Sequence, residues 1–154
     1  MLNSKILRST LKEIFGIDDA HLVPISTNWF LPTTDPNDHK STWIGYRILS
    51  KKPYTRAAQF GKDMVKNVKV QFRLTFVGKQ AEDLADQVLL WEDRTDVQLA
   101  FEKSQSQINY QDRTSFTYPV RNGGYNDEMA WIVDLSVQTS YISDTKQHSW
   151  FGTN

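Results

Sequence analysis

The chain has 154 residues, of which 39% are hydrophobic, so it is long enough for one packed core and too short for two ordinary domains. Its 18 basic and 18 acidic residues cancel, which argues against a protein that coats nucleic acid without sequence preference. Because the chain has no cysteine, disulfides, thiolate metal sites and a cysteine nucleophile are excluded.

The first segment, residues 2–15, is predicted to be an amphipathic helix that ends at Gly16. Charged residues interrupt it too often for the apolar region of a signal peptide, and no stretch approaches the roughly 20 apolar residues of a membrane span. We therefore expect a soluble protein with no membrane partner. The apolar face of the helix holds Leu7, Leu11, Ile14 and Phe15.

Two strands are predicted next, over residues 21–30 and 42–49, and a segment rich in Pro, Asp and Asn separates them. Residues 50–66 follow. They are basic and are broken by Pro53 and Gly61, so we expect a projecting loop or a loose hairpin there.

The strand at residues 68–77 has the clearest pattern, because apolar and polar side chains alternate along its whole length. We expect one face of this strand to lie in the core and the other to face water. Residues 79–91 then predict a helix, and residues 96–103 a shorter one capped by Thr95 or Asp96. The polar strand face holds Lys69, Gln71, Arg73 and Thr75, and the inward helix face holds Ala81, Leu84, Ala85, Val88 and Leu89.

The rest of the chain returns to a strand pattern, with one strand predicted from Gln107, through Ile108 and Tyr110 into 115–120, and a last one at 130–142. The tail at 143–154 has no periodicity, and its Trp150–Phe151 pair is either core filling or an anchor on a partner. These elements predict a single α+β domain over the whole chain, with a mostly antiparallel sheet of four or five strands and helices packed on one face. One core is expected to contain Val68, Phe72, Leu74, Phe76, Leu84, Val88, Trp131, Val133 and Leu135.

A search for chemistry begins at Gly78 and Lys79, which stand between a strand and a helix, where phosphate-binding loops lie. A Walker loop needs further glycines and a hydroxyl where Gln80 stands, and the dinucleotide fingerprint is missing as well. The three histidines are too scattered for a metal motif, and Asp83 and Asp86 fit a solvated helix face better than a catalytic pair. We therefore expect no enzyme activity, no catalytic residues, no cofactor and no metal.

Charge is unevenly distributed along this neutral chain: residues 47–79 carry nine bases and one acid, and residues 80–102 carry seven acids and one base. Two readings stay open. The two segments are solvated faces that neutralise each other within one subunit, or the basic surface of one copy meets the acidic surface of the next. On the second reading the interface candidates are Lys51, Lys52, Tyr54, Arg56, Lys62, Glu82, Asp83, Asp86, Glu92 and Asp93.

Three stretches carry a resemblance to a known family: VKVQFRLTFVGKQAEDLADQVLLW (68–91), DVQLAFEKSQSQI (96–108) and AWIVDLSVQTSYI (130–142). Together they resemble the tail terminator proteins, also called neck or collar proteins, that take part in head-tail joining in long-tailed bacteriophages. In such families a strand runs into a turn and a helix whose small residues are matched here by Gly78, Ala81 and Ala85, after Phe76. The likeness spans about residues 5–142 and does not explain the basic loop or the aromatic tail.

The resemblance implies a homo-oligomeric ring, with six as the expected number of subunits, that caps the tail tube, stops its polymerisation and joins the tail to the head. Its partners would be further copies of itself, the tail tube protein, a head-completion or neck protein and the tail sheath. DNA would pass only as cargo, along a channel faced by Lys69, Gln71 and Arg73. The protein would lie in the neck of the virion after assembly in the cytoplasm of the bacterial host.

Three other functions stay open at this stage. The chain fits a head-completion or adaptor protein, which would share the same neighbours. It also fits a nucleic-acid-binding module that uses the basic segment 47–79, since Tyr54 and Phe60 supply aromatic rings there. A hydrolase with an unrecognised site is the third. Salt-sensitive DNA binding would support the second, and turnover would support the third.

Overall fold

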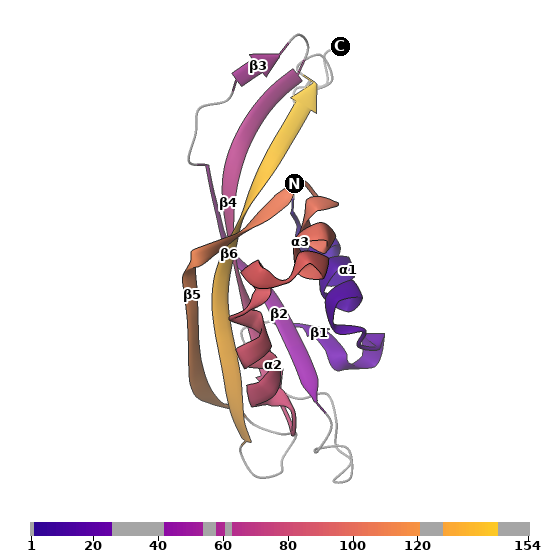
Figure 1. Ribbon diagram of the computed structural model, residues 1–154, viewed down its shortest axis with the longest axis vertical. Helices are drawn as coiled ribbons and strands as arrows, with labels where there is room; N and C mark the ends of the chain where they lie inside the picture. Colours follow the sequence, from indigo (N-terminus) through magenta and orange to yellow (C-terminus); the bar gives the residue numbers. More distant parts are fainter. Residues whose placement is uncertain (1, 26–41, 54–57, 61–62, 121–127, 145–154) are drawn as a thin grey trace.

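The computed structural model describes residues 2–25, 42–53, 58–60, 63–120 and 128–144. The described chain forms a single α+β domain in which helices cover one face of a long, twisted sheet (Figure 1). In chain order the elements, with η for a 3₁₀ helix, are α1 (Ser4–Phe15), η1 (Asp19–His21), β1 (Leu22–Pro24), β2 (Trp43–Pro53), β3 (Ala58–Phe60), β4 (Asp63–Val77), α2 (Ala81–Val88), η3 (Trp91–Asp93), α3 (Thr95–Glu102), β5 (Ser106–Val120) and β6 (Glu128–Asp144).

The sheet is mixed but mostly antiparallel, with the order β1-β2-β4-β6-β5 and with β3 paired to the first residues of β4. Among the strands that the structure describes, only β1 and β2 pair in parallel. The pairing of β4 with β6 is the longest and runs from Asp63 opposite Asp144 to Phe76 opposite Trp131. Because β2 and β5 stop short of that upper end, β4 and β6 project beyond the body of the domain, with β3 beside them (Figure 1). The sheet thus has six strands, where the sequence predicted four or five.

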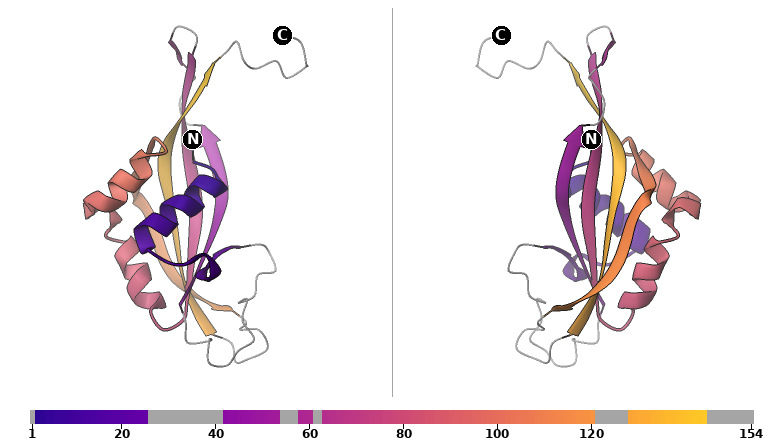
Figure 2. Two further views of the ribbon diagram at one scale, coloured as in Figure 1. Left: turned by 90° about the vertical axis from the view of Figure 1, so that its right-hand side faces the viewer. Right: turned by 90° about the vertical axis from the view of Figure 1, so that its left-hand side faces the viewer.

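The helices α1, α2 and α3 all lie on one face of the sheet, as predicted (Figure 2). The alternation along β4 explains this arrangement, since Val70, Phe72 and Leu74 are completely buried on that face. All nine residues predicted to share one core do so, although Leu84 and Trp131 are only partly buried.

A run of aromatic rings joins the helices to the sheet in this core. The Phe15 ring lies 5.8 Å from Phe76 and 5.7 Å from Trp91, measured between ring centroids. Trp91 in turn lies 5.8 Å from Phe101, and Phe101 lies 6.2 Å from Phe72. These separations fall in the range in which aromatic pairs attract each other beyond the area that they bury. The rings therefore tie α1, η3 and α3 to β4.

The opposite face of the sheet is not uniformly wet, which corrects the sequence interpretation. Thr75, predicted to face water, is only 3% exposed. It pairs with Gly45 and Ile132, close to a second apolar cluster on this face. The Ile25 side chain also covers Gly45, where an added Cβ would come within 2.3 Å of the Ile25 Cδ1 atom. This cluster consists of Trp43, Val77, Ala130 and Ile132, with Val23 and Phe116 packed against it.

Residues 50–66 were predicted to form a projecting loop or a loose hairpin, and β3 with the start of β4 does form a hairpin there. The two ends of the segment are strand instead, because β2 continues to Pro53 and β4 begins at Asp63. The short β3 lies between them and pairs back onto β4. Pairing with long neighbouring strands thus extends the sheet into a segment whose own sequence favours a loop.

Two other elements differ from the sequence prediction in their boundaries. Of the strand predicted at 21–30, β1 covers three residues and a 3₁₀ turn precedes it. The first two residues of the predicted tail, 143 and 144, belong to β6. The rest of that tail, with Trp150 and Phe151, lies outside the described residues.

The turn from β4 into α2 has the geometry expected of a glycine corner. Gly78 has a φ of 114°, a conformation that residues with a Cβ rarely adopt. The Ala81 N–H donates to the Gly78 carbonyl oxygen at 3.2 Å, and the Gln80 N–H donates to the Thr42 hydroxyl at 3.2 Å. The helix begins at Ala81, two residues later than predicted. α3 begins at Thr95 without a side-chain cap, so the predicted capping by Thr95 or Asp96 is wrong.

Candidate functional site

The basic candidates that the structure describes lie near the end of β2. This strand has a bulge between Ile48 and Ser50, after which Lys51 pairs with Val70 and Lys52 pairs with Lys69. Lys51 and Lys52 are both exposed. Tyr54, Arg56 and Lys62, the other candidates from this segment, lie outside the described residues.

The acidic candidates lie on α2 and on the 3₁₀ helix that follows it. The inward face of α2 is made of Ala81, Ala85 and Val88, all buried. Helical spacing therefore turns the carboxylates of this helix outward. The exposed acids are Glu82, Asp83 and Asp86 on α2, with Asp93 on η3.

Glu92 differs from the other acidic candidates because it is half-buried. Its backbone carbonyl oxygen accepts a hydrogen bond from the side-chain amide of Gln98. Its side chain lines a pocket rather than the exposed acidic surface.

The start of the acidic surface lies far from the basic surface on one subunit, and from there α2 leads back along the sheet to Trp91, whose ring packs against Phe101. From Val70, opposite Lys51, β4 runs seven residues to Val77 before the turn into α2, which is roughly 23 Å of strand. The surfaces are also displaced sideways, since α2 packs over β4 and β6 while β2 lies on the other side of β4. The described charges of the two surfaces therefore do not meet within one chain.

The ion pairs of the described residues agree with this separation. None of them includes Lys51, Lys52 or the exposed acids of α2 and η3. One acid of the same segment, Asp96, is held instead by Arg94 at 2.6 Å, and hydrogen bonds from Arg94 lower the pKa of Asp96 below its ordinary value. The pairs are Arg8–Asp19, Lys12–Asp19, His21–Asp18, Arg73–Asp134, Arg94–Asp96 and Lys103–Glu13.

The residues predicted to face a channel lie on the helix-free face of the sheet. Gln71 is exposed and Lys69 is half-buried. Arg73 makes two hydrogen bonds to Asp134 on β6, at 2.7 and 2.9 Å, and its guanidinium lies 5.5 Å from the centre of the Phe116 ring. The hydrogen bonds from Arg73 to Asp134 raise the pKa of Arg73 above its ordinary value. Arg73 is thus held by its neighbours and is not presented as a free cation.

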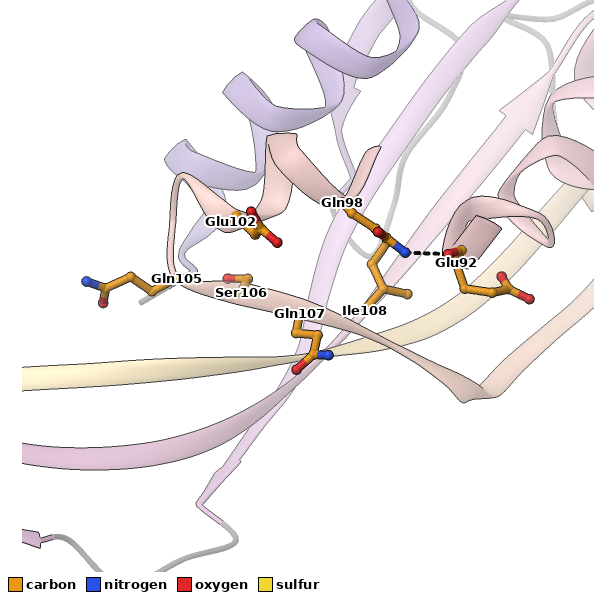
Figure 3. A pocket seen from close by; sticks show the side chains of 7 residues that line it. All are labelled: Glu92, Gln98, Glu102, Gln105, Ser106, Gln107 and Ile108. Atoms are coloured by element: carbon orange, nitrogen blue, oxygen red, sulfur yellow. Dashed lines mark hydrogen bonds between the residues drawn. The ribbon is translucent and has the colours of Figure 1, made fainter. Parts of the chain in front are cut away.

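A polar pocket of about 650 Å³ lies between α3 and the start of β5 (Figure 3). The carboxylates of Glu92 and Glu102 lie on opposite sides of it and do not converge (Figure 3). Among the described residues no group of three or more His, Asp and Glu side chains is placed to hold a metal ion. The pocket therefore offers no recognisable catalytic arrangement in this part of the chain. Its lining residues are Glu92, Gln98, Glu102, Gln105, Ser106, Gln107 and Ile108.

A second pocket, of about 580 Å³, lies where the ends of α1 and β4 approach each other. It is lined in part by Lys79 and by His21. The His21 Nδ1 atom lies 2.6 Å from the Asp18 carboxylate, and the His21 ring lies 4.4 Å from the ring of Trp43. His21 is therefore engaged in the packing of the turn before β1.

Sequence reasoning missed the exposed leucines, which lie beside the charged candidates. Leu49 is 37% exposed and follows the last paired residue of β2 before its bulge. Leu89 was predicted to face inward, yet it is also 37% exposed, and Leu90 is 59% exposed. The helical spacing that predicted an inward Leu89 no longer applies there, because α2 ends at Val88.

Together the fold and these surfaces define a single-domain α+β protein with unpaired charge at two separate places. No protein-family model matches the chain, and no curated protein matches it either. None of the described helices is long and apolar enough to span a membrane.

Proposed function

We propose that the protein is a tail terminator of a long-tailed bacteriophage, a ring of six copies that caps the tail tube and joins the tail to the head. Its place is the neck of the virion, after assembly in the host cytoplasm. Its neighbours are the tail tube protein, a head-completion or neck protein and the tail sheath, with DNA as cargo. This proposal starts from the resemblance of residues 68–91, 96–108 and 130–142 to that family.

The four residues that carry the resemblance have structural roles that fit the family pattern. Phe76 is completely buried at the end of β4, and Gly78 has the positive φ of a sharp corner. Ala81 and Ala85 are buried, so that small side chains let α2 pack closely on the sheet. The resemblance is therefore supported by a strand, turn and helix of the expected kind.

The observation that carries the proposal is the separation of the basic surface from the acidic surface on one subunit. Opposite charges that do not meet within a chain are complementary between copies. When the two surfaces of an interface differ, repetition of the same contact closes into a ring if the rotation divides a full circle. Lys51 and Lys52 of one subunit then face Glu82, Asp83 and Asp86 of the next, and each surface is used once.

The nucleic-acid alternative is less well supported, because one of its cations is already engaged. A phosphate that approached Arg73 would have to displace two hydrogen bonds to Asp134. The helix-free face near Thr75 also carries an apolar cluster in place of further charge.

The proposal is tested by the length of tails and by the mass of the assembly. Phage that lack the protein should make tails of irregular, excessive length that do not join heads, and adding the purified protein should restore capping. Native mass measurement, on free protein and on protein released from tails, should give six copies. Tails of normal length with heads that lose DNA would indicate a head-completion protein instead. A monomer that binds DNA in a salt-sensitive manner would contradict the ring.

A further inference from the structure

Exposed leucines lie within both charged surfaces. On the basic side, Leu49 is 37% exposed and precedes Lys51 and Lys52 on the same strand. On the acidic side, Leu89 and Leu90 are 37% and 59% exposed and lie between Asp86 and Asp93 in sequence. Each surface therefore combines one sign of charge with apolar side chains.

The bulge in β2 explains why Leu49 is exposed. Ile48 pairs with Phe72 and Ser50 pairs with Gln71, so Leu49 is the extra residue with no partner on β4. A bulge bends its strand and re-aims a side chain, and bulges are over-represented at functional positions. Arg47, Lys51 and Lys52 around it are all exposed. Side chains alternate along a strand, so Lys51, opposite Val70, and Lys52, opposite Lys69, point to opposite faces of the sheet and flank Leu49 from both.

The end of α2 explains the exposure of Leu89 and Leu90. The helix ends at Val88, and the N–H groups of Leu89 and Leu90 donate to the carbonyl oxygens of Asp86 and Gln87, both at 3.1 Å. Val88 before the pair and Trp91 after it are completely buried. The core therefore holds the residues on each side, and the two leucines project between them.

We propose that this leucine pair is the docking site for a second copy of the chain, which inserts Leu49 there and places Lys51 and Lys52 against the acids of α2 and η3. The inference rests on the proposed ring and names the contact that holds it. Charge complementarity selects a second copy as the occupant, because the acids flanking Leu89 and Leu90 are opposite in sign to the cations flanking Leu49. Apolar contact at the centre with charges around it is the usual anatomy of a specific interface.

The same charges decide the symmetry of the contact. A two-fold interface with either surface on its axis would place that surface against its own copy, so lysine would meet lysine or aspartate would meet aspartate, whereas a two-fold dimer that avoids this forms the unlike contact twice. Contact between unlike surfaces avoids this repulsion and leaves one surface of each kind free at the ends of any incomplete assembly. The proposed ring uses the unlike contact once at each surface of a subunit, and in that ring the docking is head-to-tail.

Single cysteines test the contact directly, because the chain contains none of its own. The variants Leu49→Cys and Leu90→Cys replace exposed side chains, and Ser9→Cys, on the exposed side of α1, is the matched control. Each is treated with a short bifunctional maleimide, alone and in equal mixtures, on free concentrated protein and on protein bound to tails. A tag on one variant identifies the chains in each product.

The expected result is a covalent dimer in the mixture of Leu49→Cys with Leu90→Cys that contains one chain of each. Either variant alone, or either mixed with Ser9→Cys, should give little dimer. If Leu49→Cys or Leu90→Cys joins to itself as readily as in the mixture, the contact is two-fold and the inference is overturned. Absence of the mixed product from both free and tail-bound protein also overturns it, and would point to another protein as the occupant.

The outcome is separable from that for the proposed function. Rings that cap tails at normal length without the mixed cross-link would overturn this contact and leave the terminator proposal intact. The mixed cross-link in a protein that never caps tails would support this contact and overturn the terminator proposal. A Leu90→Asp variant adds a second measure, since it should weaken association about tenfold or more if the leucine lies at the centre of the contact.

Discussion

Single residues in the aromatic core connect the layers of this domain. Phe72 is completely buried and its ring faces Phe101, which in turn faces Trp91. A side chain at such a position makes many contacts with both the sheet and the helices, so its removal leaves a cavity that the neighbours fill only in part.

Replacement of Phe72 by Ala should lower the free energy of unfolding by about 3 to 5 kcal/mol, through lost burial and the cavity left behind. Urea unfolding at neutral pH measures the difference. The matched control is Leu90→Ala, which shortens a side chain that is 59% exposed and should change stability by less than about 0.5 kcal/mol. Equal effects of the two variants would contradict the assignment of Phe72 to the core.

Residue patterns predicted the core well and the second face of the sheet poorly. Alternation identified Phe72, Leu74 and Phe76 because a half-buried strand needs an apolar side chain at every second position. Alternation predicted that Thr75 faces solvent, whereas Ile132 on the neighbouring strand and the apolar residues around Ile132 bury Thr75. That outcome depends on which strands become neighbours, and a single strand's pattern does not contain this information.

Among the elements, the corner between β4 and α2 has the strictest geometric requirement. Gly78 adopts a φ of 114°, and Gly16 at the end of α1 adopts a φ of 61°. At Gly16 a Cβ would have nothing within 4 Å, so only the backbone conformation opposes a larger residue there. The two glycines thus form a natural pair for comparison.

The variant Gly78→Ala should destabilise the protein by about 1 to 3 kcal/mol, because alanine is strained at this φ. Gly16→Ala should cost less, about 1 kcal/mol, since the left-handed helical region is strained but accessible and alanine also restricts the unfolded chain. Chemical unfolding of both variants against the wild type provides the comparison. An unchanged Gly78→Ala protein would show that the corner relaxes, and the glycine requirement would then be wrong.

Sequence periodicity predicted the existence of most elements and placed their ends less well. α1, α2 and α3 were predicted because their apolar stripes repeat at helical spacing, and β4 and β6 because theirs alternate. The short β3 and the bulge in β2 were not predicted, since both depend on pairing with β4. The sequence of one strand does not specify its register against a neighbouring strand. The register of β2 against β4 is what places the basic surface far from the start of α2.

At the scale of the whole molecule, the sheet separates the basic residues at the end of β2 from the acids at the start of α2. The chain is neutral overall, yet none of the ion pairs of the described residues includes Lys51, Lys52 or an acid of α2. Exposed ion pairs are each worth about 0 to 1 kcal/mol, so apolar contact must supply most of the affinity between copies. The charges would set which surfaces meet and in what register.

Charge reversal tests this pairing and the number of subunits together. In one variant Lys51 and Lys52 become Glu, which makes both surfaces acidic, and in the other Glu82, Asp83 and Asp86 become Lys, which makes both basic. Each variant alone should fail to assemble or to cap tails, because like charges meet at every contact. A chain carrying all five changes should assemble, since the complementarity is restored in reversed order. Similar unfolding curves for all variants would exclude misfolding as the cause.

The mixture of the two singly reversed variants gives the sharpest outcome. Acidic and basic chains can alternate around a closed ring only when the number of subunits is even, so a ring of six should form from equal amounts of both. The mass of this mixed ring should equal three chains of each variant, and added salt should weaken it because exposed charges are screened over about 8 Å at physiological ionic strength. Assembly of either variant alone would contradict the charge pairing. Open chains in the mixture, beside closed rings of the chain with all five changes, would show that the ring has an odd number of subunits.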